Sequence, residues 1–394
     1  MLKVDFVKVA FFHIVFPNGE FLNVEECCTG IGKWMTYQSA FGGIASELVD
    51  TDIQTKHITN VSEIDGAVTH VLIPFVVGFE TLAANIAKDI RQRNPNVVIM
   101  ALCYPKGLAT ETQYTCEFTY FIADDNPVKT VLKALDVEAK SRFPVVVPSS
   151  IPHASVMTWL LIGSGCPYQC KFCVWAGRKT EWRTPQNTLD SVLTIHANAL
   201  MIANETSKPY YLCPEMSKTW LEKYIEVRDE MKLSIKFVTD VRLDEIDKDF
   251  ADVLVQSGCN EVTTGLESCN QRILDEMGKH MDLEAWLNGF KLLNERYIVV
   301  NTSLLFGLSD DESPIEYADF VLRNEIRGLR AGICKIYPST KLFDEIRSSN
   351  SEVDWYKEHT LQTEPYMVRK GIEKTLTKLK KFNELMDTQY VKYA

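Results

Sequence analysis

Apolar runs typical of strands alternate with amphipathic segments typical of helices over the first third of the chain. Residues 7–12, 69–77 and 97–102 are short apolar runs, and between the last two the apolar side chains of residues 80–93 recur on one helical face. The proline in the following segment RNPN ends that helix. Strands that alternate with helices pair in parallel and are covered by helices. We therefore expect an α/β fold that begins with a Rossmann-like domain over residues 1–145.

The hydrophobic pattern breaks over residues 140–153, which contain three prolines. Beyond this segment the alternation restarts, and too few strands follow to close a full TIM barrel. We expect a partial (β/α)6 TIM-type barrel over residues 150–345, and a helical extension with an amphipathic C-terminal helix over residues 346–394. The six strand-like runs of the barrel are residues 157–162, 209–213, 234–239, 260–265, 297–305 and 329–336.

Composition narrows the class of protein. The chain is 46% hydrophobic and 24% charged, and its 42 Lys and Arg against 53 Asp and Glu give a net charge of −11, which argues against nucleic acid as a partner. No run reaches the ~18 apolar residues of a membrane span, and the start shows no small-residue cleavage pattern, so we expect no membrane partner and a cytoplasmic location. The eleven cysteines, an odd number with Cys27 and Cys28 adjacent, fit a reducing compartment.

Three cysteines follow the first barrel strand in the segment GCPYQCKFC, at Cys166, Cys170 and Cys173. A loop at the carboxyl end of a parallel strand is where such folds place their chemistry. Zinc would need a fourth ligand, usually from a second Cys or His pair, and none lies nearby in the sequence. Three thiolates can instead hold an iron–sulfur cluster and leave one iron with open coordination for a substrate or cofactor.

The segment CPYQCKFC, preceded by a barrel strand, resembles the signature of the radical S-adenosylmethionine superfamily. The resemblance implies that Cys166, Cys170 and Cys173 bind a 4Fe-4S cluster, and that its unique iron chelates S-adenosylmethionine (SAM). Reductive cleavage of SAM then yields a 5′-deoxyadenosyl radical. Phe172, the aromatic residue before the last cysteine, would lie against the adenine.

The resemblance extends to about residues 155–345, most closely to enzymes of the methylthiotransferase and cobalamin-associated kind. It implies that Arg242 and Glu267 reach the ribose, amine or carboxylate of SAM and that Ser268 supports them. In the segment LLFGLSDDES, Asp311 and Glu312 stand where the family often has glycine and glutamate. The structural alternative for each of these polar residues is an ordinary surface ion pair or a helix cap.

The second barrel strand departs from the family pattern. It ends in YYLCPEMS, with Cys213 and Glu215 at the carboxyl end of the strand. A thiol is a good hydrogen-atom donor, so Cys213 is a candidate catalytic residue that quenches a substrate radical. The alternative is a buried core cysteine, since free cysteine is often buried. Cys334 on the sixth strand has a similar but weaker claim.

The first domain resembles the cobalamin-binding domain that precedes the barrel in one class of these enzymes. No D-x-H-x-x-G segment supplies a histidine to cobalt, and Ala101 and Leu102 replace the double glycine that lets a corrin approach the backbone. His13, the lone histidine of the first strand, fits a core or edge residue better than a ligand. Cobalamin therefore remains open as a third cofactor, and the alternative is a domain that serves as a scaffold.

The sequence as a whole predicts a radical SAM enzyme that abstracts hydrogen from a small-molecule substrate, leading to methylation or radical rearrangement. A reductase or a flavodoxin-type protein would supply the electron. Two alternatives remain: modification of a nucleic acid or peptide, and a non-catalytic iron–sulfur or cobalamin-binding sensor. The substrate itself cannot be read from loops that vary independently of the fold.

Overall fold

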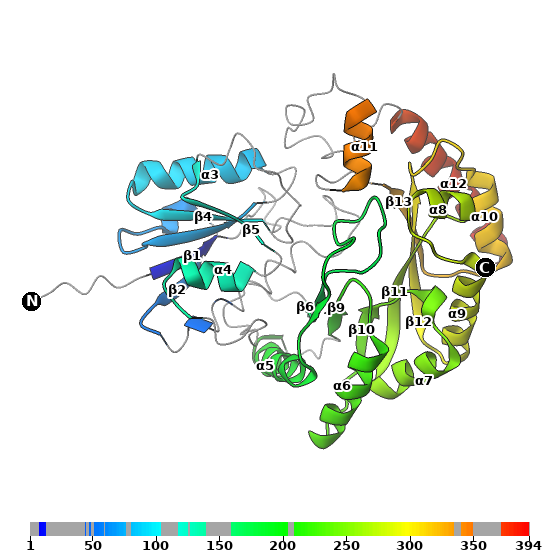
Figure 1. The fold of residues 1–394 in the computed structure, drawn as a ribbon, viewed down its shortest axis with the longest axis horizontal. Coiled ribbons are helices and arrows are strands. Elements are labelled where there is room, and N and C mark those ends of the chain that lie inside the picture. Colours follow the sequence, from blue (N-terminus) through cyan, green and yellow to red (C-terminus); the bar gives the residue numbers. More distant parts are fainter. Residues whose placement is uncertain are drawn as a thin grey trace, which may run out of the picture.

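The strands of the protein form two parallel sheets and one short antiparallel ladder. The two sheets lie next to each other in Figure 1, the first in blue and cyan and the second in green to orange. The computed structural model describes residues 8–12, 44, 47–48, 51–58, 60–75, 80–103, 117–124, 127–138, 159–203, 209–334, 340–349 and 372–393. The predicted domain boundary near residues 140–153 and His13 lie outside these residues.

The first sheet has the strand order β2-β1-β3-β4-β5, and every neighbouring pair is parallel. The direction of winding reverses between β1 and β3, which is the doubly wound arrangement that the alternating pattern predicted. The strands are β1 (Lys8–Phe12), β2 (Gln54–Ile58), β3 (His70–Pro74), β4 (Val98–Cys103) and β5 (Tyr120–Ala123). The sequence did not reveal β2, because this edge strand reads QTKHI and has no apolar run.

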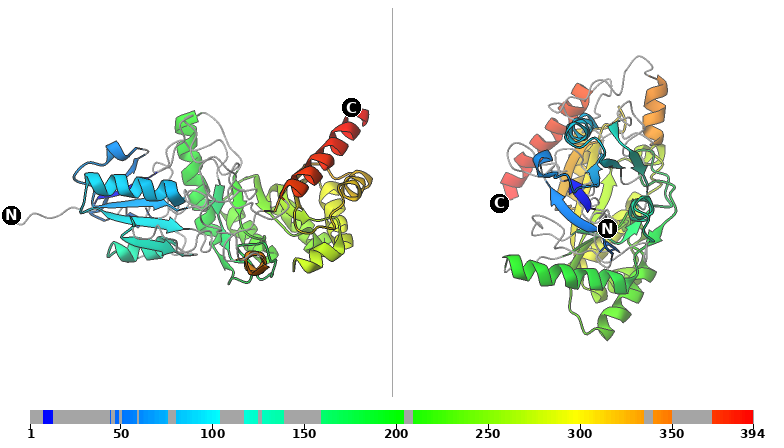
Figure 2. Two further views of the ribbon diagram at one scale, coloured as in Figure 1. Left: turned by 90° about the horizontal axis from the view of Figure 1, so that it is seen from above. Right: turned by 90° about the vertical axis from the view of Figure 1, so that its left-hand side faces the viewer.

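Helices α3 (Glu80–Arg93) and α4 (Pro127–Ala134) cover opposite faces of the first sheet, as Figures 1 and 2 show. Periodicity predicts that helix α3 buries Leu82, Ile86, Ala87 and Ile90. Ala87 and Ile90 are fully buried, Leu82 and Ile86 are half-buried against the same core, and Ala83 is buried beside them. A 3-10 turn, η1 (Val61–Glu63), precedes β3 and is closed by a capping box from Asn60.

The second sheet has six parallel strands in the order β13-β12-β11-β10-β9-β6. From β9 to β13, strands that are consecutive in the chain are neighbours in the sheet, and β6 pairs with β9 because the two strands between them form a separate ladder. The sheet is open, so the predicted partial (β/α)6 barrel is confirmed. Its strands are β6 (Trp159–Leu161), β9 (Tyr210–Leu212), β10 (Phe237–Asp240), β11 (Cys259–Glu267), β12 (Val299–Phe306) and β13 (Leu329–Ile333). The antiparallel ladder of β7 (Gly163–Ser164) with β8 (Glu181–Trp182) was not predicted, because two-residue strands leave no hydrophobic period.

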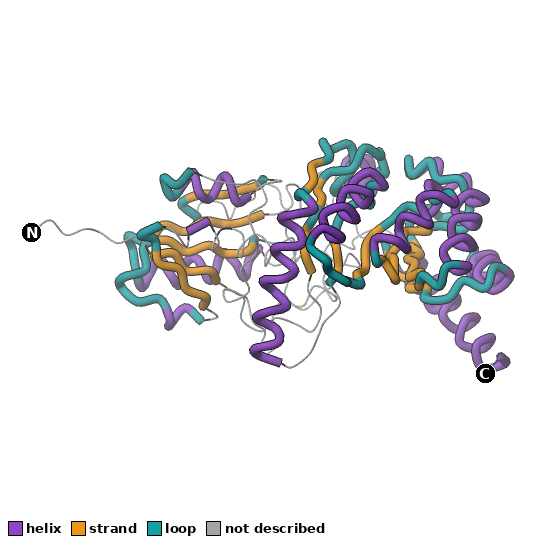
Figure 3. Tube along the Cα trace, turned by 90° about the horizontal axis from the view of Figure 1, so that it is seen from below, coloured by secondary structure: helices purple, strands orange, loops and turns teal. Residues whose placement is uncertain are grey.

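Helices cover the outer side of the second sheet, and Figure 3 shows them as purple tubes around the orange strands. They are α5 (Pro185–Ala203), α6 (Lys218–Glu230), α7 (Lys248–Ser257), α8 (Gln271–Glu276), α9 (Leu283–Glu295), α10 (Pro314–Arg323), α11 (Lys341–Ser349) and α12 (Ile372–Tyr393), with the 3-10 turn η4 (Leu243–Glu245) before α7. The amphipathic C-terminal helix α12 packs against α10, β12 and β13 (Figure 2). Among the described residues, no helix is long and apolar enough to cross a membrane.

Burial alternates along the barrel strands and separates two faces of the sheet. On β11 and β12, alternate residues such as Leu266, Leu304 and Phe306 are buried on the helix side. The ring of Phe306 lies 5.4 Å from that of Tyr317 in α10 and 5.5 Å from that of Phe382 in α12. The intervening residues face the inside of the barrel and are only half-buried, which leaves that inner face open for a ligand.

Helix α7 ends where its sequence predicts. Phe250, Val253 and Leu254 bury the predicted apolar stripe, and Gly258 follows with a left-handed φ of 94°. A Cβ atom at Gly258 would lie 2.2 Å from the carbonyl oxygen of Ile235, so only glycine fits both the conformation and the space.

Gly289 in α9 provides a test of the barrel packing. A Cβ atom there would lie 2.0 Å from the backbone oxygen of Leu243 in η4, and backbone cannot move aside as a flexible side chain does. We expect Gly289→Ala to destabilise the barrel by about 1–3 kcal/mol, as overpacking does. Thermal unfolding would measure this, with Gly66→Ala as the control, because a Cβ atom at exposed Gly66 meets nothing within 4 Å. Equal melting temperatures for the two variants would contradict the close contact.

Candidate functional site

The three cysteines of the predicted signature lie on a loop closed by the β7–β8 ladder, which we call the cysteine loop (residues 165–180). Gly165 opens it with a φ of 76°, and a Cβ atom there would lie 2.1 Å from the backbone oxygen of Lys179. Cys166, Cys170 and Cys173 are each half-buried, and the amide of Cys173 donates to the carbonyl of Cys170 at 3.1 Å. The loop therefore brings all three side chains to the carboxyl end of the barrel.

Burial controls the charge of these thiols. It raises the pKa of Cys166 and of Cys173 to about 12, and it raises the pKa of Cys170 as well, although Lys279 and Arg242 oppose the shift there. Protonated thiols bind metal only after losing their protons, so a strongly positive group is needed to hold them as thiolates. An iron–sulfur cluster meets that requirement.

The arrangement of the candidate ligands also distinguishes a site for an iron–sulfur cluster from a site for a single metal ion. In the described part of the chain, no three His, Cys, Asp or Glu side chains converge as the ligands of one metal ion would. A zinc site needs such convergence. The cysteines of a cubane cluster bind different irons, so they stand apart around it. A donor set of three thiols fits a 4Fe-4S cluster.

The barrel holds the cysteine loop from two further elements. The amide of Lys171 donates to the carbonyl of Met277 after α8 at 2.8 Å, and the carbonyl of Lys171 accepts from the amide of Leu342 in α11 at 2.9 Å. Phe172 packs beside this point against an apolar cluster that includes Met277 and Phe343. The predicted contact of Phe172 with adenine stays a prediction, and its described contacts fix the loop.

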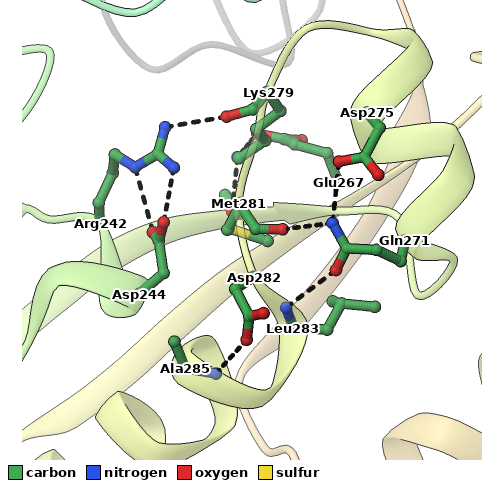
Figure 4. A network of polar contacts seen from close by, with 11 residues as sticks. Arg242, Asp244, Glu267, Gln271, Asp275, Lys279, Met281, Asp282, Leu283 and Ala285 are labelled. Atoms are coloured by element: carbon green, nitrogen blue, oxygen red, sulfur yellow. Dashed lines mark hydrogen bonds and ion pairs between the residues drawn. The ribbon is translucent and has the colours of Figure 1, made fainter.

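Arg242, at the carboxyl end of β10, links the cysteine loop to the barrel. Its guanidinium lies over the ring of Tyr168, 3.8 Å from the centroid, and pairs with both carboxylate oxygens of Asp244 at 3.1 and 2.6 Å. It also donates to the carbonyl oxygen of Lys279 at 3.2 Å (Figure 4). A guanidinium has more N–H donors than these contacts use, so Arg242 keeps donors for a ligand. Tyr168 was not singled out in the sequence, because one aromatic residue in a loop carries no signal.

Glu267 ends β11 in a strained conformation, with a φ of 62°. The Nζ atom of Lys279 lies 3.3 Å from its carboxylate and 2.6 Å from the carbonyl oxygen of Gly265. A Cβ atom at Gly265 would lie 2.0 Å from that carboxylate, so a side chain there would displace Glu267 from this position. The strand end thus bends the carboxylate back over its own backbone, where Lys279 holds it. The sequence contained Lys279 in the matching segment but gave it no role.

Ser268 and Glu312 stabilise turns near the site. The Ser268 hydroxyl lies 2.6 Å from the hydroxyl of Tyr317 and accepts from the amide of Asn270 at 3.1 Å, so it fixes the turn after Glu267. The buried carboxylate of Glu312 accepts from the amides of three residues, Gly307, Leu308 and Ser309. Asp311 instead forms a surface ion pair with Arg272 at 2.6 Å. Glu312 therefore caps backbone amides and Asp311 forms a surface ion pair, which are the structural roles named as the alternative to SAM binding.

Cys213 lies in the core between the sheet and its helices. Its Sγ atom is 3.6 Å from the hydroxyl of Thr239, and it shares a side of the sheet with Tyr211, whose ring stacks on that of Phe237 at 4.5 Å. Burial raises the pKa of the thiol well above its ordinary value. These contacts favour the buried-core alternative for Cys213, and its hydrogen-atom donor role stays a prediction. Cys334 is also buried, in the apolar cluster around Phe343.

Glu215 lies near the side chains that are candidates for binding the cofactors. Burial raises its pKa to about 7, while the positive charges of Arg242 and Lys279 pull in the opposite direction. It also acts on Cys166, whose pKa its negative charge helps to raise. A carboxyl group that is close to both cations and to the cysteine loop is suited to hold a cationic ligand group there.

The inner face of the barrel carries polar side chains that the sequence did not single out. The Tyr210 hydroxyl donates to Oδ1 of Asp240 at 2.7 Å, and the Asn301 amide donates to Glu261 at 2.7 Å. Burial raises the pKa of Asp240 to about 7. Tyrosine and aspartate in adjacent strands are too common for sequence alone to pair them.

In the first sheet, Ala101 and Leu102 stand where the sequence comparison expects the double glycine that lets a corrin approach the backbone, and their side chains were expected to hinder that approach. Both residues are fully buried inside β4. Ala101 pairs with Ile73 of β3 and Phe121 of β5, and Leu102 pairs with Pro74 and Ile122 of the same two strands. The described backbone at this position therefore offers no open approach to a corrin ring. The loops that follow β1, β3 and β4, where a doubly wound sheet binds its ligands, are outside the described residues.

Comparison with known proteins agrees with this geometry. Residues 160–321 match the family model of the Radical SAM superfamily. The chain is 25% identical over 221 residues to bacteriochlorophyllide d C-12(1)-methyltransferase of Chlorobaculum tepidum, and 26% identical over 264 residues to the C-8(2)-methyltransferase of the same organism. These matches cover 53% and 61% of this chain and 47% and 55% of the relatives. The chain thus spans about half the length of the curated relatives it matches.

Two solved structures share the fold over most of the chain. TsrM from Kitasatospora setae, a radical SAM methyltransferase with tryptophan substrate and a SAM analogue bound, superimposes with a TM-score of 0.64 at 14% identity, covering 88% of this chain and 77% of that one. OxsB, a cobalamin-dependent SAM radical enzyme with aqua-cobalamin bound, superimposes with a TM-score of 0.59 at 13% identity, covering 88% and 61%. Matches of this extent include both sheets.

The resemblance found in the sequence is thereby confirmed. The family match over residues 160–321 identifies the barrel and the cysteine loop as a radical SAM domain, and such a domain implies a 4Fe-4S cluster and S-adenosylmethionine as cofactors.

Proposed function

We propose that this protein is a radical SAM methyltransferase that acts on a small molecule. The observation that carries the proposal is a cysteine loop with three half-buried cysteines at the carboxyl end of a partial barrel, in a chain that shares its fold with TsrM over 88% of its length. The curated relatives named as methyltransferases support methylation over rearrangement. When bound, the cluster and SAM supply a primary carbon radical able to abstract hydrogen from an unactivated carbon.

Cys166, Cys170 and Cys173 are the proposed cluster ligands. Their loop is fixed at Lys171, between the second and third cysteines, by backbone hydrogen bonds to Met277 and Leu342, which prepares the thiols for the cluster at low cost in conformational entropy. Burial protects the site from water and keeps the free thiols protonated until iron displaces the protons.

Arg242, Glu267, Lys279 and Glu215 are the proposed groups that bind SAM. The methionine part of SAM carries an amine and a carboxylate, and these four side chains offer two positive and two negative partners. Ion pairs already join Arg242 to Asp244 and Lys279 to Glu267. The pairs hold the side chains in place before the ligand arrives, which reduces the entropy lost on binding.

The substrate would enter the barrel from the open inner face. The net charge of −11 and the absence of any nucleic-acid motif in the sequence support a small molecule over RNA or DNA. A cytoplasmic reductase or flavodoxin-type protein is the proposed electron donor, because the cluster must be reduced from outside the barrel.

Cobalamin in the first domain is the proposed methyl carrier. The support is the fold shared with structures of TsrM and OxsB that hold cobalamin, at TM-scores of 0.62 and 0.59 over 88% of this chain. The buried Ala101 and Leu102 do not fit a corrin at that position, so no step is assigned to the domain's residues. Without cobalamin, the reaction would be a rearrangement, elimination or oxidation.

The cluster assignment can be tested by chemical analysis. We expect anaerobically reconstituted protein to hold about four irons and four sulfides, and to lose the cluster when any one of Cys166, Cys170 and Cys173 is changed to alanine. Cys259→Ala is the matched control, because that cysteine is buried at the amino end of β11, away from the cysteine loop. The reduced wild-type protein should cleave SAM to 5′-deoxyadenosine and methionine. A redox-active cluster in the triple alanine variant would refute the ligand set, and no cleavage by a loaded wild type would refute the enzyme.

The SAM-binding groups can be tested by calorimetry on cluster-loaded protein. We expect Arg242→Ala and Glu267→Gln each to weaken SAM binding about tenfold or more, because each removes a charge-assisted hydrogen bond. Arg296→Ala is the control, since Arg296 makes a comparable ion pair with Asp252 at 2.7 Å on the helix side. Unchanged affinity in both site variants, at full cluster content, would remove these residues from the SAM site.

Cobalamin binding can be decided by purification with hydroxocobalamin supplied. We expect about one corrin per chain, with the base-off absorbance of a cobalt that no imidazole ligates, and we expect His13→Ala to leave that spectrum unchanged. Colour from the iron cluster alone would make the first domain a scaffold and would exclude cobalamin as the methyl carrier.

A further inference from the structure

The inner face of the barrel is polar along its centre. Strand register places Asp240 of β10 beside Thr263 of β11, and Thr263 beside Asn301 of β12, so these three residues form one level across the sheet. Tyr210 of β9 lies next to Val238, two residues before Asp240, and its side chain reaches up to that level. Side chains at the same level of parallel strands face the same space.

Asp240 is held by one carboxylate oxygen only. Its Oδ1 atom accepts the hydroxyl of Tyr210 at 2.7 Å, and the hydroxyl of Thr263 hydrogen-bonds to Tyr210 in turn. Its Oδ2 atom is buried and has no hydrogen-bond partner among the described residues. A buried carboxylate oxygen without a partner costs free energy, and native structures rarely leave one without a functional reason.

The environment of Asp240 lacks a positive charge. The influences on its pKa are burial, Tyr210 and the backbone amide of Cys213, and no cation is among them. The cations nearest in the fold are engaged elsewhere, Arg242 with Asp244 and Lys279 with Glu267. A ligand that brings a positive charge with N–H donors would satisfy both the oxygen and the charge.

The position of Asp240 suits a substrate group. Its partner Thr263 lies two residues before Gly265, whose carbonyl binds Lys279 below the proposed SAM site. Two residues along a strand are about 7 Å, so Asp240 lies one level deeper in the barrel than the SAM groups. A molecule anchored at this level would stand between the sheet and the proposed radical source.

We propose that Asp240 anchors the substrate of this enzyme, and that the substrate is a small molecule with a protonated amine, which donates a hydrogen bond to Oδ2 of Asp240. This inference rests on the proposed function, because it assigns the substrate class of the same site. An ordered water on Oδ2 is the competing occupant.

Calorimetry with defined probes tests the anchor. Cluster-loaded protein with SAM bound would be titrated with ethylammonium, benzylammonium and tryptamine, and with the neutral isosteres ethanol, benzyl alcohol and tryptophol. We expect wild-type protein to bind at least one amine at least tenfold more tightly than its neutral isostere, and Asp240→Asn to lose that preference. Asp319→Asn is the control, because Asp319 pairs with Arg323 on the exposed surface of α10 and should keep it.

Two results would overturn the proposal. One is wild-type protein that prefers none of the amines over its neutral isostere, which is the outcome expected if water occupies Oδ2. The other is an amine preference that persists in Asp240→Asn. Cleavage of SAM by the reduced wild-type protein is measured separately, without a probe. Failure of cleavage refutes the proposed function, whereas cleavage without amine preference refutes only the anchor.

Discussion

The site depends on parallel pairing of β9 to β12, because this pairing gives the sheet one sealed face and one open face. The sealed face is packed with large side chains such as Tyr211, Trp220 and Phe306, which leave no room for a ligand. Apart from small hydroxyl groups such as those of Thr264 and Thr302, the polar side chains of β11 and β12 lie on the other face or at the carboxyl ends. The cysteine loop then needs only to close over these ends to complete a chamber.

Charge within this chamber is balanced in pairs before any cofactor binds. Arg242 with Asp244 and Lys279 with Glu267 are both almost buried, with side-chain exposures of 11%, 10%, 9% and 13%, respectively. Ion pairs in such an environment add little net stability, since desolvation offsets their attraction. Their contribution is orientation, because they fix in place the side chains that we propose bind SAM. The strained φ of Glu267 is a further cost of the kind that structures retain at functional sites.

Sequence reasoning was sound where the signal is periodic or has a fixed spacing. Helix α3, the stripe of α7 with its Gly258 stop, and the cysteine motif were all found in this way. It failed where the signal is short or polar, as at edge strand β2 and at the β7–β8 ladder. At the site, it named Arg242, Glu267 and Ser268 but not Tyr168, Tyr210 or Asp240. The roles of these three residues depend on contacts with residues far apart in the sequence, and no local sequence pattern predicts such contacts.

The C-terminal helix has a consequence for the order of folding. Lys378 of α12 donates to the carbonyl of Ser309, 69 residues earlier in the chain, and lies 3.5 Å from the carboxylate of Glu312. The loop after β12 therefore carries a buried negative charge whose ion-pair partner, within the described part of the chain, is a lysine synthesised much later. During translation, this part of the barrel has to wait for α12 to leave the ribosome, while the first sheet, complete by β5 and α4, can already be folded.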